Sequence, residues 1–195
     1  CSMNLVKFPR RRYTPGPTPI ESLPRFSEAL GGPRIFIKRD DQLGLAAGGN
    51  KTRKLEFLVA EALAQGADTL IPCGAVQSNH CRLTLAAAVK EGLKCRLALE
   101  ERVPGTYDPE SSGNNFLFRL LGVEQVRVWP GGQDMMAAMK QMAADVTAEG
   151  RKAYVIPGGG SNPLGATGYA ACALEILEQV VEDADHLIIE STYGD

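Results

Sequence analysis

The sequence predicts an α/β fold, because short apolar segments typical of buried strands alternate with longer segments of helical periodicity. A second observation is that glycine-rich or polar turns separate these segments. The chain has 195 residues, of which 44% are hydrophobic and 23% charged, a balance typical of folded globular proteins. That length is sufficient to bury a core and corresponds to one domain or to two small ones.

The alternation can be followed residue by residue. Strands are expected at residues 34–38, 69–72, 95–100, 125–129, 153–157 and 187–189, and helices at 51–65, 82–90, 112–121, 134–149 and 163–182. Between Thr69 and Pro157 this pattern predicts four parallel strands joined by right-handed helical crossovers. The first segment, up to Pro24, is rich in proline and arginine and is expected to be extended.

Two helix starts are clearly marked. Asn50 is a favourable N-cap residue, and it precedes apolar residues at helical spacing: Leu55, Leu58, Val59, Ala62 and Leu63. On that helix Glu56 and Glu61 are expected to face solvent. Asn162 followed by Pro163 predicts the start of the last long helix, since proline is favoured at the first helical position.

Composition and charge exclude several classes of protein. The net charge of −2 offers no basic field for nucleic acid or an anionic membrane, and the basic runs 10–12 and 38–39 are expected to be solvated. No apolar run approaches the roughly 20 residues that span a bilayer. The five cysteines form no C-x-x-C pair and only His80 and His186 could add nitrogen ligands, so no metal site is expected. Scattered cysteines in apolar surroundings indicate reduced thiols and a cytoplasmic protein.

The most informative segment is GGNKTRKLE, residues 48–56. Two glycines allow a flat ligand to approach the backbone, and Lys51 follows them in the first turn of a helix. The partial positive charge of a helix N-terminus disfavours an ammonium group there, and desolvation acts in the same direction. A neutral amine is the form that condenses with a carbonyl group to give a Schiff base. The alternative is that Lys51 is a surface lysine after a turn.

Two further segments lie between a strand and a helix. In GAVQSNHCR, residues 74–82, the side chains of Gln77, Ser78 and Asn79 are expected at the carboxyl end of the sheet, where open α/β sheets bind ligands. A simple Ser/Asn helix cap explains them equally well. In PGGGSNPLG, residues 157–165, free backbone amides could bind an anion, or the glycines could form a tight interdomain turn. Neither a P-loop nor a dinucleotide-binding G-x-G-x-x-G is present.

In this order and spacing, GGNKTRKLE, GAVQSNHCR and VIPGGGSNPLGATGY resemble the D-cysteine desulfhydrase and 1-aminocyclopropane-1-carboxylate deaminase family. The segments PGPTPIESLPRFSEALGG and IFIKRDD resemble it as well, so that the likeness covers about residues 4–179. The family has the tryptophan-synthase-β-like fold, fold type II of the pyridoxal-phosphate enzymes. Within the family, the chain resembles the D-cysteine desulfhydrase and L-cysteate sulfo-lyase branch more than the deaminases. This likeness is carried by the segments GGNKTRKLEFLVAEAL and LEERVPGTYDPESSGNNFLF.

The resemblance implies the role of each candidate residue. Lys51 would bind pyridoxal 5'-phosphate as a Schiff base and move the α-proton of a small amino-acid substrate. Asn79 would hydrogen-bond the phenolic oxygen of the cofactor, with Asn50 also at the cofactor and Lys54 at its phosphate. Ser78 would lie beside the cofactor ring near the substrate, and Gln77 near the substrate carboxylate. The expected reaction is β-elimination from D-cysteine, cysteate or chloroalanine.

The resemblance also implies a two-domain architecture of open twisted sheets. Residues 51–160 are expected to form the small α/β domain, and 1–50 and 161–195 to belong to the larger cofactor domain. The C-terminal part of that domain, with the family's phosphate loop and a later tyrosine, is expected to be absent from this chain. The tail after about residue 179 is atypical, and IIESTYGD resembles a short signature of metallo-β-lactamase-type nucleases. Deamination of 1-aminocyclopropane-1-carboxylate and an inactive truncated or binding fragment are the alternatives. A homodimer is expected.

Overall fold

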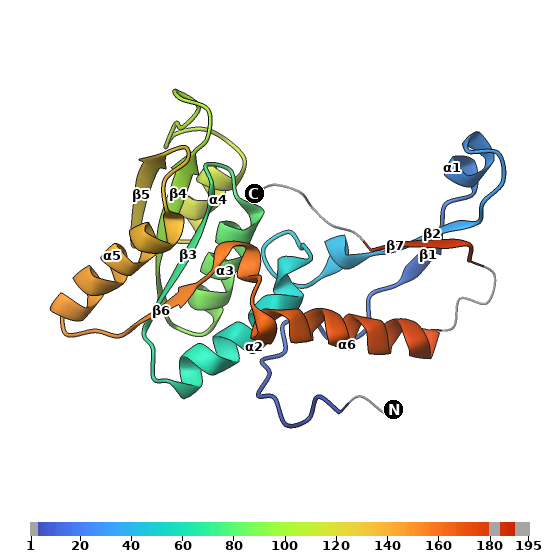
Figure 1. The fold of residues 1–195 in the computed structure, drawn as a ribbon, viewed down its shortest axis with the longest axis horizontal. Coiled ribbons are helices and arrows are strands. Elements are labelled where there is room, and N and C mark those ends of the chain that lie inside the picture. The colour runs from blue at the N-terminus through green and yellow to red at the C-terminus, as the bar shows by residue number, and fades with distance from the viewer. Residues whose placement is uncertain (1–3, 180–183, 190–195) are drawn as a thin grey trace.

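The computed structural model describes residues 4–179 and 184–189 and arranges them around two separate sheets (Figure 1). The larger sheet consists of β3 (Thr69–Ala75), β4 (Lys94–Glu101), β5 (Gln125–Pro130) and β6 (Ala153–Ile156), in the order β5-β4-β3-β6. Every pairing in it is parallel. The α/β class and the four parallel strands predicted from the sequence are therefore confirmed.

Helices cover both faces of this sheet. On one face α3 (Asn79–Lys90) contacts β3 and β4, and it also contacts α2 (Lys51–Ala64) and α4 (Asn114–Leu120), while α5 (Met135–Ala148) packs on the other face. The side-chain alternation of a strand explains the two layers. In β4, Leu97 and Leu99 join the core shared with α2 and α3, whereas Ala98 joins the core beneath α5.

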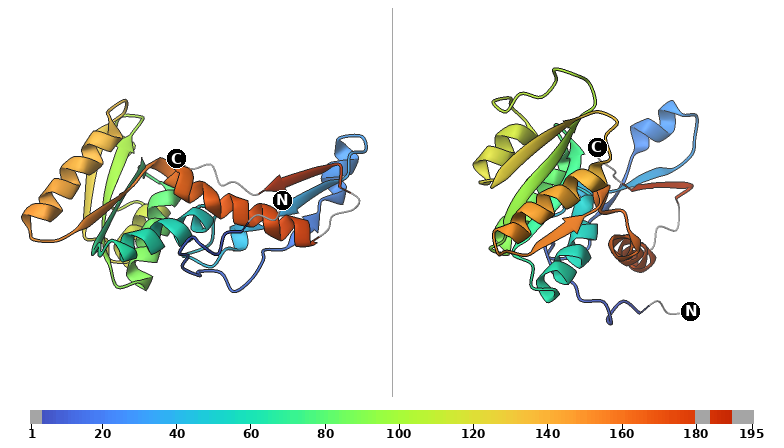
Figure 2. Two further views of the ribbon diagram at one scale, coloured as in Figure 1. Left: turned by 60° about the horizontal axis from the view of Figure 1, so that its bottom comes forward. Right: turned by 60° about the vertical axis from the view of Figure 1, so that its left-hand side comes forward.

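The smaller sheet is formed by β1 (Ile20–Ser22), β2 (Ile35–Lys38) and β7 (His186–Ile189), in which β2 pairs antiparallel with β1 and parallel with β7. In Figures 1 and 2 the two sheets occupy opposite ends of the molecule, with the long helix α6 (Pro163–Gln179) running between them. Packing of α6 on α2 joins the two halves. The two helices approach closely at Gly168, where a Cβ would lie only 2.3 Å from the Arg53 carbonyl oxygen.

Several elements differ from the sequence-based expectation. The short helix α1 (Pro24–Ala29) and the single turns η1 (Asp40–Gln42) and η2 (Gly158–Gly160) were not expected. Helix α3 begins at Asn79 instead of residue 82, because the Ser78 side chain caps it. The expected end of the last helix at residue 182 and most of the IIESTYGD tail, residues 190–195, lie outside the described residues.

Charged side chains expected in solvent are buried or half-buried, which corrects the sequence-based expectation. Lys38 is completely buried, and its Nζ donates to the Thr18 carbonyl oxygen at 2.7 Å. Glu56 is 2% exposed and pairs with Arg10 at 2.5 Å. Glu61 is half-buried and accepts a hydrogen bond from the Tyr154 hydroxyl. In each case the partner is distant in sequence, so the local amphipathic pattern could not predict it.

The N-terminal segment, residues 4–13, explains the burial of Glu56. Its backbone runs along α2, where the Arg11 amide donates to the Glu56 carbonyl oxygen at 2.8 Å and the Tyr13 amide donates to the Glu56 carboxylate at 3.0 Å. Arg11 also pairs with Glu91, at the end of α3, at 2.9 Å. The N-terminal segment therefore joins the outer faces of α2 and α3 through hydrogen bonds and ion pairs.

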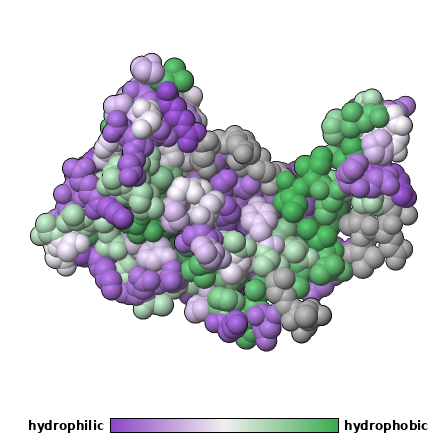
Figure 3. Space-filling view, in the orientation of Figure 1, coloured by the Kyte–Doolittle hydropathy of each residue, from purple (hydrophilic) through white to green (hydrophobic). Residues whose placement is uncertain are grey.

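The visible surface differs between the two ends of the molecule. Figure 3 shows hydrophobic residues gathered over the three-stranded sheet, whereas polar residues dominate the outer part of the other end. Large apolar side chains in this region are exposed, among them Phe26, Leu30 and Leu177. In the described part of the chain no helix combines the length and apolar character needed to cross a membrane.

Candidate active site

The three segments identified in the sequence meet at one edge of the larger sheet. Because β3 and β6 are parallel neighbours, their carboxyl ends lie at the same edge, which brings the loop before α3 close to η2. Helix α2 contacts both α3 and η2, and α3 contacts η2 as well. The N-termini of α2 and α3 and the glycine turn of η2 thus surround one region, at the sheet edge where ligands of open α/β sheets bind.

Lys51 is the first residue of α2 and follows a strained turn. Residues 46–49 all have positive φ, with values of 30°, 69°, 78° and 137°. At Gly48 a Cβ would lie 1.8 Å from the Asp41 carbonyl oxygen, so no other residue fits there without rearrangement. The Lys51 side chain is half-buried, and its Nζ donates to the Asn50 Oδ1 at 3.3 Å. This turn fixes the position from which the Lys51 amine extends.

Asn50 occupies the N-cap position of α2 but does not cap it with its side chain. Its backbone is helical, with φ −62° and ψ −25°, and no side-chain capping hydrogen bond forms. The expectation of an Asn50 side-chain cap is therefore wrong. The Asn50 side chain does not cap α2 because the backbone at Asn50 already has helical dihedral angles. The side chain contacts Lys51 instead.

Lys54 lies one turn further along the same face of α2 as Lys51. Its Nζ donates to the Ser161 Oγ at 2.9 Å, just beyond η2. Gly160 makes this approach possible, because a Cβ there would already be 3.3 Å from the Lys54 Cβ. On the other side, the Tyr169 hydroxyl of α6 lies 3.4 Å from the Asn50 carbonyl oxygen. Two lysines, a serine and a tyrosine therefore surround the start of α2.

The start of α3 presents Gln77, Ser78 and Asn79. The Ser78 Oγ accepts a hydrogen bond from the Cys81 amide at 3.1 Å, so Ser78 caps the helix. Gln77 is exposed and its side chain holds the loop before α4: its Oε1 accepts from the Asn114 amide at 2.7 Å, and its Nε2 donates to the Ser112 carbonyl oxygen at 3.1 Å. Asn79 is half-buried at the first position of α3.

Two further residues of this region, Arg82 and Asn114, are not predicted from the sequence. Arg82 donates to the Asn79 Oδ1 at 3.0 Å, to the Asn114 Oδ1 at 2.9 Å and to the Gly48 carbonyl oxygen at 2.8 Å. Burial lowers the pKa of Arg82 from its ordinary value. A sequence signal existed for Asn114. Like Asn79, it is an asparagine at the start of a helix that follows a strand.

Comparisons with known proteins identify the family. Residues 12–194 match the family model described as pyridoxal-phosphate dependent enzyme. The chain belongs to the pyridoxal-phosphate dependent enzymes. The crystal structure of an ACC deaminase homologue is 42% identical and superposes with a TM-score of 0.82, covering 91% of this chain and 53% of that one. A pyridoxal 5'-phosphate-dependent aspartate racemase, 18% identical over 85% of this chain and 46% of its own length with a TM-score of 0.62, shares the fold.

These comparisons establish the fold type and the cofactor. The fold is the tryptophan-synthase-β-like fold type II of pyridoxal-phosphate dependent enzymes, and the cofactor is pyridoxal 5'-phosphate. The chain spans about half the length of the solved structures that it matches, 53% and 46%.

The residues at the sheet edge fit this cofactor chemically. An aldehyde requires a primary amine, which Lys51 provides in the first turn of α2. A phosphate requires cations and hydrogen-bond donors, which Lys54 and the Ser161 hydroxyl next to η2 provide. In the described part of the chain no cluster of three or more His, Cys, Asp or Glu side chains is placed to bind a metal ion.

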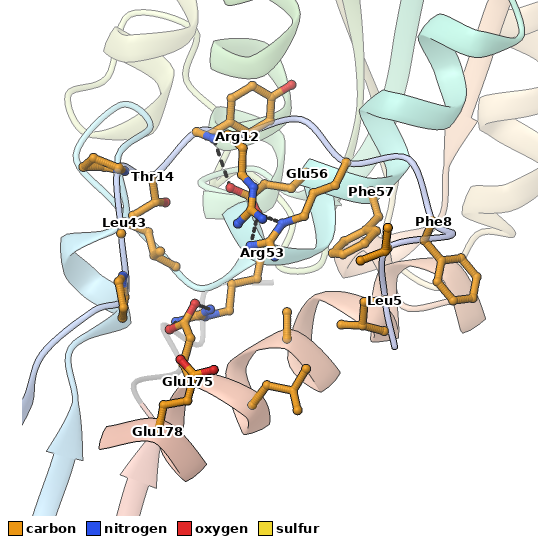
Figure 4. Close-up of a pocket in the computed structure, with 18 of the residues that line it drawn as sticks. Leu5, Phe8, Arg12, Thr14, Leu43, Arg53, Glu56, Phe57, Glu175 and Glu178 are labelled. Atoms are coloured by element: carbon orange, nitrogen blue, oxygen red, sulfur yellow. Dashed lines mark hydrogen bonds and ion pairs between the residues drawn. The ribbon is translucent and has the colours of Figure 1, made fainter. Parts of the chain in front are cut away.

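A large cleft lies elsewhere, on the opposite face of α2 (Figure 4). It has a volume of about 1180 Å³ between the N-terminal segment, α2 and α6, and its walls include Phe8, Arg12, Arg53, Phe57 and Glu178. None of the six candidate residues lines it. Helical geometry explains the separation, because positions 53, 56 and 57 face away from positions 51, 54 and 58.

Proposed function

We propose that this protein is a lyase that catalyses β-elimination from D-cysteine or a close analogue such as cysteate or chloroalanine. With D-cysteine and water, the products are pyruvate, ammonia and hydrogen sulfide. The main support is the convergence of the Lys51 turn and the Asn79 helix start at one sheet edge, joined through Arg82. The resemblance of the sequence to the desulfhydrase branch supports this choice of substrate.

Each candidate residue has a proposed role in this reaction. The Lys51 Nζ would hold the cofactor and, as a free amine, would move the proton of the substrate Cα. The Asn79 amide donates to the phenolic oxygen of the cofactor, and Asn50 orients the Lys51 amine through the 3.3 Å contact. When bound, pyridoxal phosphate supplies a conjugated ring that stabilises negative charge at the substrate Cα.

The remaining residues bind and orient the substrate and the phosphate. Lys54, together with the Ser161 hydroxyl 2.9 Å away, interacts with the phosphate. Ser78 lies beside the ring and orders the first amides of α3, which point toward a substrate carboxylate. Gln77 acts near that carboxylate by holding the loop before α4, through its hydrogen bonds to Ser112 and Asn114.

A second candidate is deamination of 1-aminocyclopropane-1-carboxylate to 2-oxobutyrate and ammonia. The observation in its favour is the 42% identity to an ACC deaminase homologue over 91% of this chain. Both reactions require the same amine and the same electron-withdrawing ring. They differ in how they begin: D-cysteine loses the proton of its Cα, whereas the Cα of 1-aminocyclopropane-1-carboxylate carries no hydrogen and a bond of the three-membered ring must open. Their products distinguish them.

The experiment is an end-point assay of the protein loaded with pyridoxal phosphate. Sulfide and pyruvate are measured with D-cysteine, and 2-oxobutyrate with 1-aminocyclopropane-1-carboxylate. The proposal expects sulfide and pyruvate in a 1:1 ratio, abolished in Lys51→Ala and retained at least in part in Lys90→Ala, a lysine at the far end of α3. Exclusive formation of 2-oxobutyrate would establish the second candidate, and no product from either substrate would refute both.

We also propose that residues 51–160 form the small domain, that residues 1–50 and 161–195 belong to the larger cofactor domain, and that the protein is a homodimer. All strands of the larger sheet lie within residues 51–160, and those of the smaller sheet lie outside that range. Exposed apolar side chains near the smaller sheet, Phe26 at 47% and Leu177 at 74%, favour association with a second copy of the chain. Sedimentation velocity tests this: a species of twice the chain mass supports the dimer, and a monomer at all concentrations excludes it.

A further inference from the structure

Arg82 is a buried cation whose hydrogen bonds go only to neutral oxygens. It is 9% exposed, yet within residues 4–179 and 184–189 no carboxylate pairs with it. Its Nε is also buried and has no hydrogen-bond partner there. Buried arginines are normally paired with a carboxylate, as Arg53 is with Asp40, because desolvation of an isolated charge is unfavourable. A purely structural role therefore explains Arg82 poorly.

The contacts of Arg82 fix the orientation of two side-chain amides. Since a guanidinium only donates hydrogen bonds, the atoms that it contacts on Asn79 and Asn114 must be their carbonyl oxygens. The Asn114 Nδ2 then donates to the Gln77 carbonyl oxygen at 2.6 Å and to the same Asn79 Oδ1 at 2.9 Å. The Asn79 oxygen is thus held by two donors.

This leaves one end of the Asn79 amide for a ligand. Within the described part of the chain, the Asn79 side chain forms two hydrogen bonds. Both use Oδ1, and neither uses Nδ2. If the amide were flipped, two donors would face its NH₂ group, which is unfavourable. Asn79 can therefore present only a donor to a group bound at the start of α3.

Arg82 also holds the turn that precedes Lys51. Its Nη2 donates to the Gly48 carbonyl oxygen at 2.8 Å, in the middle of the positive-φ stretch 46–49. Strained backbone of this kind persists only where surrounding contacts hold it. The same guanidinium therefore connects the turn before the cofactor lysine to the amide that faces the cofactor.

We propose that Arg82 is a positioning residue for the cofactor: its fork holds the Asn79 oxygen and the Gly48 carbonyl together, so that the Asn79 NH₂ group donates to the phenolic oxygen of pyridoxal phosphate. This inference rests on the proposed function, in which Lys51 binds the cofactor. It assigns the effect to geometry rather than to the charge of Arg82, since lysine keeps the charge but lacks the rigid fork with which Arg82 donates to three separate oxygens.

The test is a pH titration of the visible absorbance of the holoprotein. A hydrogen bond donated to the phenolic oxygen favours the deprotonated form of the bound cofactor, so its loss raises the midpoint pH. Arg82→Lys is expected to raise the midpoint by about one pH unit, and Asn79→Ala by a similar amount. Arg96→Lys is the matched control: Arg96 is 7% exposed and pairs with Glu124 and Glu149, so its loss should lower the melting temperature and leave the midpoint unchanged.

The double variant Arg82→Lys/Asn79→Ala decides the mechanism. If Arg82 acts through Asn79, the double variant shifts no further than either single variant. An unshifted midpoint in Arg82→Lys, or additive shifts in the double variant, would overturn the inference. Should Arg82→Lys fail to fold, Asn114→Ala removes the second donor to the Asn79 oxygen and is expected to raise the midpoint, and an unchanged midpoint would overturn it equally. A wild-type protein without a Lys51-dependent visible band would instead refute the proposed function.

Discussion

Replacing Arg53 with methionine should destabilise the fold more than any exposed ion pair could. Arg53 is 2% exposed and forms a two-point ion pair with the fully buried Asp40, at 2.7 and 2.8 Å. It forms a second one with Glu175 of α6, at 2.9 Å for each contact. Burial alone would raise the pKa of Glu175, but hydrogen bonds from Arg53 and Lys38 lower it below its usual value. The guanidinium therefore connects α2, α6 and the turn after β2.

The size of the effect follows from what remains after the substitution. Asp40 would keep a buried negative charge with only the Thr18 hydroxyl, at 2.8 Å, as a donor to its side chain among the described residues. Removing one partner of a buried pair costs about 3–5 kcal/mol. For a chain of this size about 1 kcal/mol lowers the melting temperature by about 2–4 °C, so a decrease of about 6–20 °C is expected. Lys38, 3.1 Å from Glu175, moderates the loss on that side.

Thermal unfolding followed by circular dichroism measures this decrease. Arg127→Met is the matched control, since the Arg127–Asp145 pair is 33% and 42% exposed and should contribute only about 0–1 kcal/mol. Adding Asp40→Asn to Arg53→Met should recover part of the loss, because it removes the uncompensated charge. If Arg53→Met unfolds at the same temperature as Arg127→Met, the assignment of a stabilising role to this network is wrong.

Three further predictions concern the turn, the N-terminal segment and acid stability. Gly48→Ala should lower stability and cofactor retention sharply, whereas Gly66→Ala, at φ +72° with open space around it, should cost only about 1 kcal/mol; urea unfolding compares them, and equal losses would contradict the steric argument. Glu56→Gln should release the N-terminal segment and accelerate tryptic cleavage within it, and an unchanged cleavage rate would count against the ion pairs that hold it. A hydrogen bond from Arg151 helps to lower the pKa of Glu124 to about 2, so its contribution is present above its usual value of 4.5 and lost as the pH falls toward 2. Wild-type protein should therefore lose more unfolding free energy than Glu124→Gln between about pH 5 and about pH 3, and equal losses would refute this.

Sequence periodicity predicted the larger sheet well because its strands and helices alternate and each is defined by local pattern. The segment around Asn79 could be placed at the carboxyl end of the sheet for the same reason, because it follows a predicted strand and opens a helix. The position of Lys51 beside it could not be predicted in this way, because α2 follows β2 of the smaller sheet. The role of Arg82 could not be predicted, because it arises from a contact between Gly48 and the start of α3, 34 residues apart. Glu56 was misplaced for a similar reason: its partners come from the N-terminal segment, which no periodicity connects to α2.

The Asn50 prediction shows a different limit. An asparagine before a helical pattern favours a side-chain cap, and that preference is a local property of the sequence. The positive-φ turn at residues 46–49 overrides it, because the chain already enters α2 with helical dihedral angles. Such a turn depends on close packing of Gly48 against the Asp41 carbonyl oxygen, which becomes visible only in three dimensions.

The most direct test of the account is borohydride reduction of the protein loaded with pyridoxal phosphate, followed by tryptic digestion and mass spectrometry. Reduction makes the bond between cofactor and lysine permanent, so the modified residue can be identified. We expect a single modified lysine, Lys51, with Lys54 unmodified three residues away. Modification of Lys54 or of any other lysine in place of Lys51, or no modification at all, would contradict it.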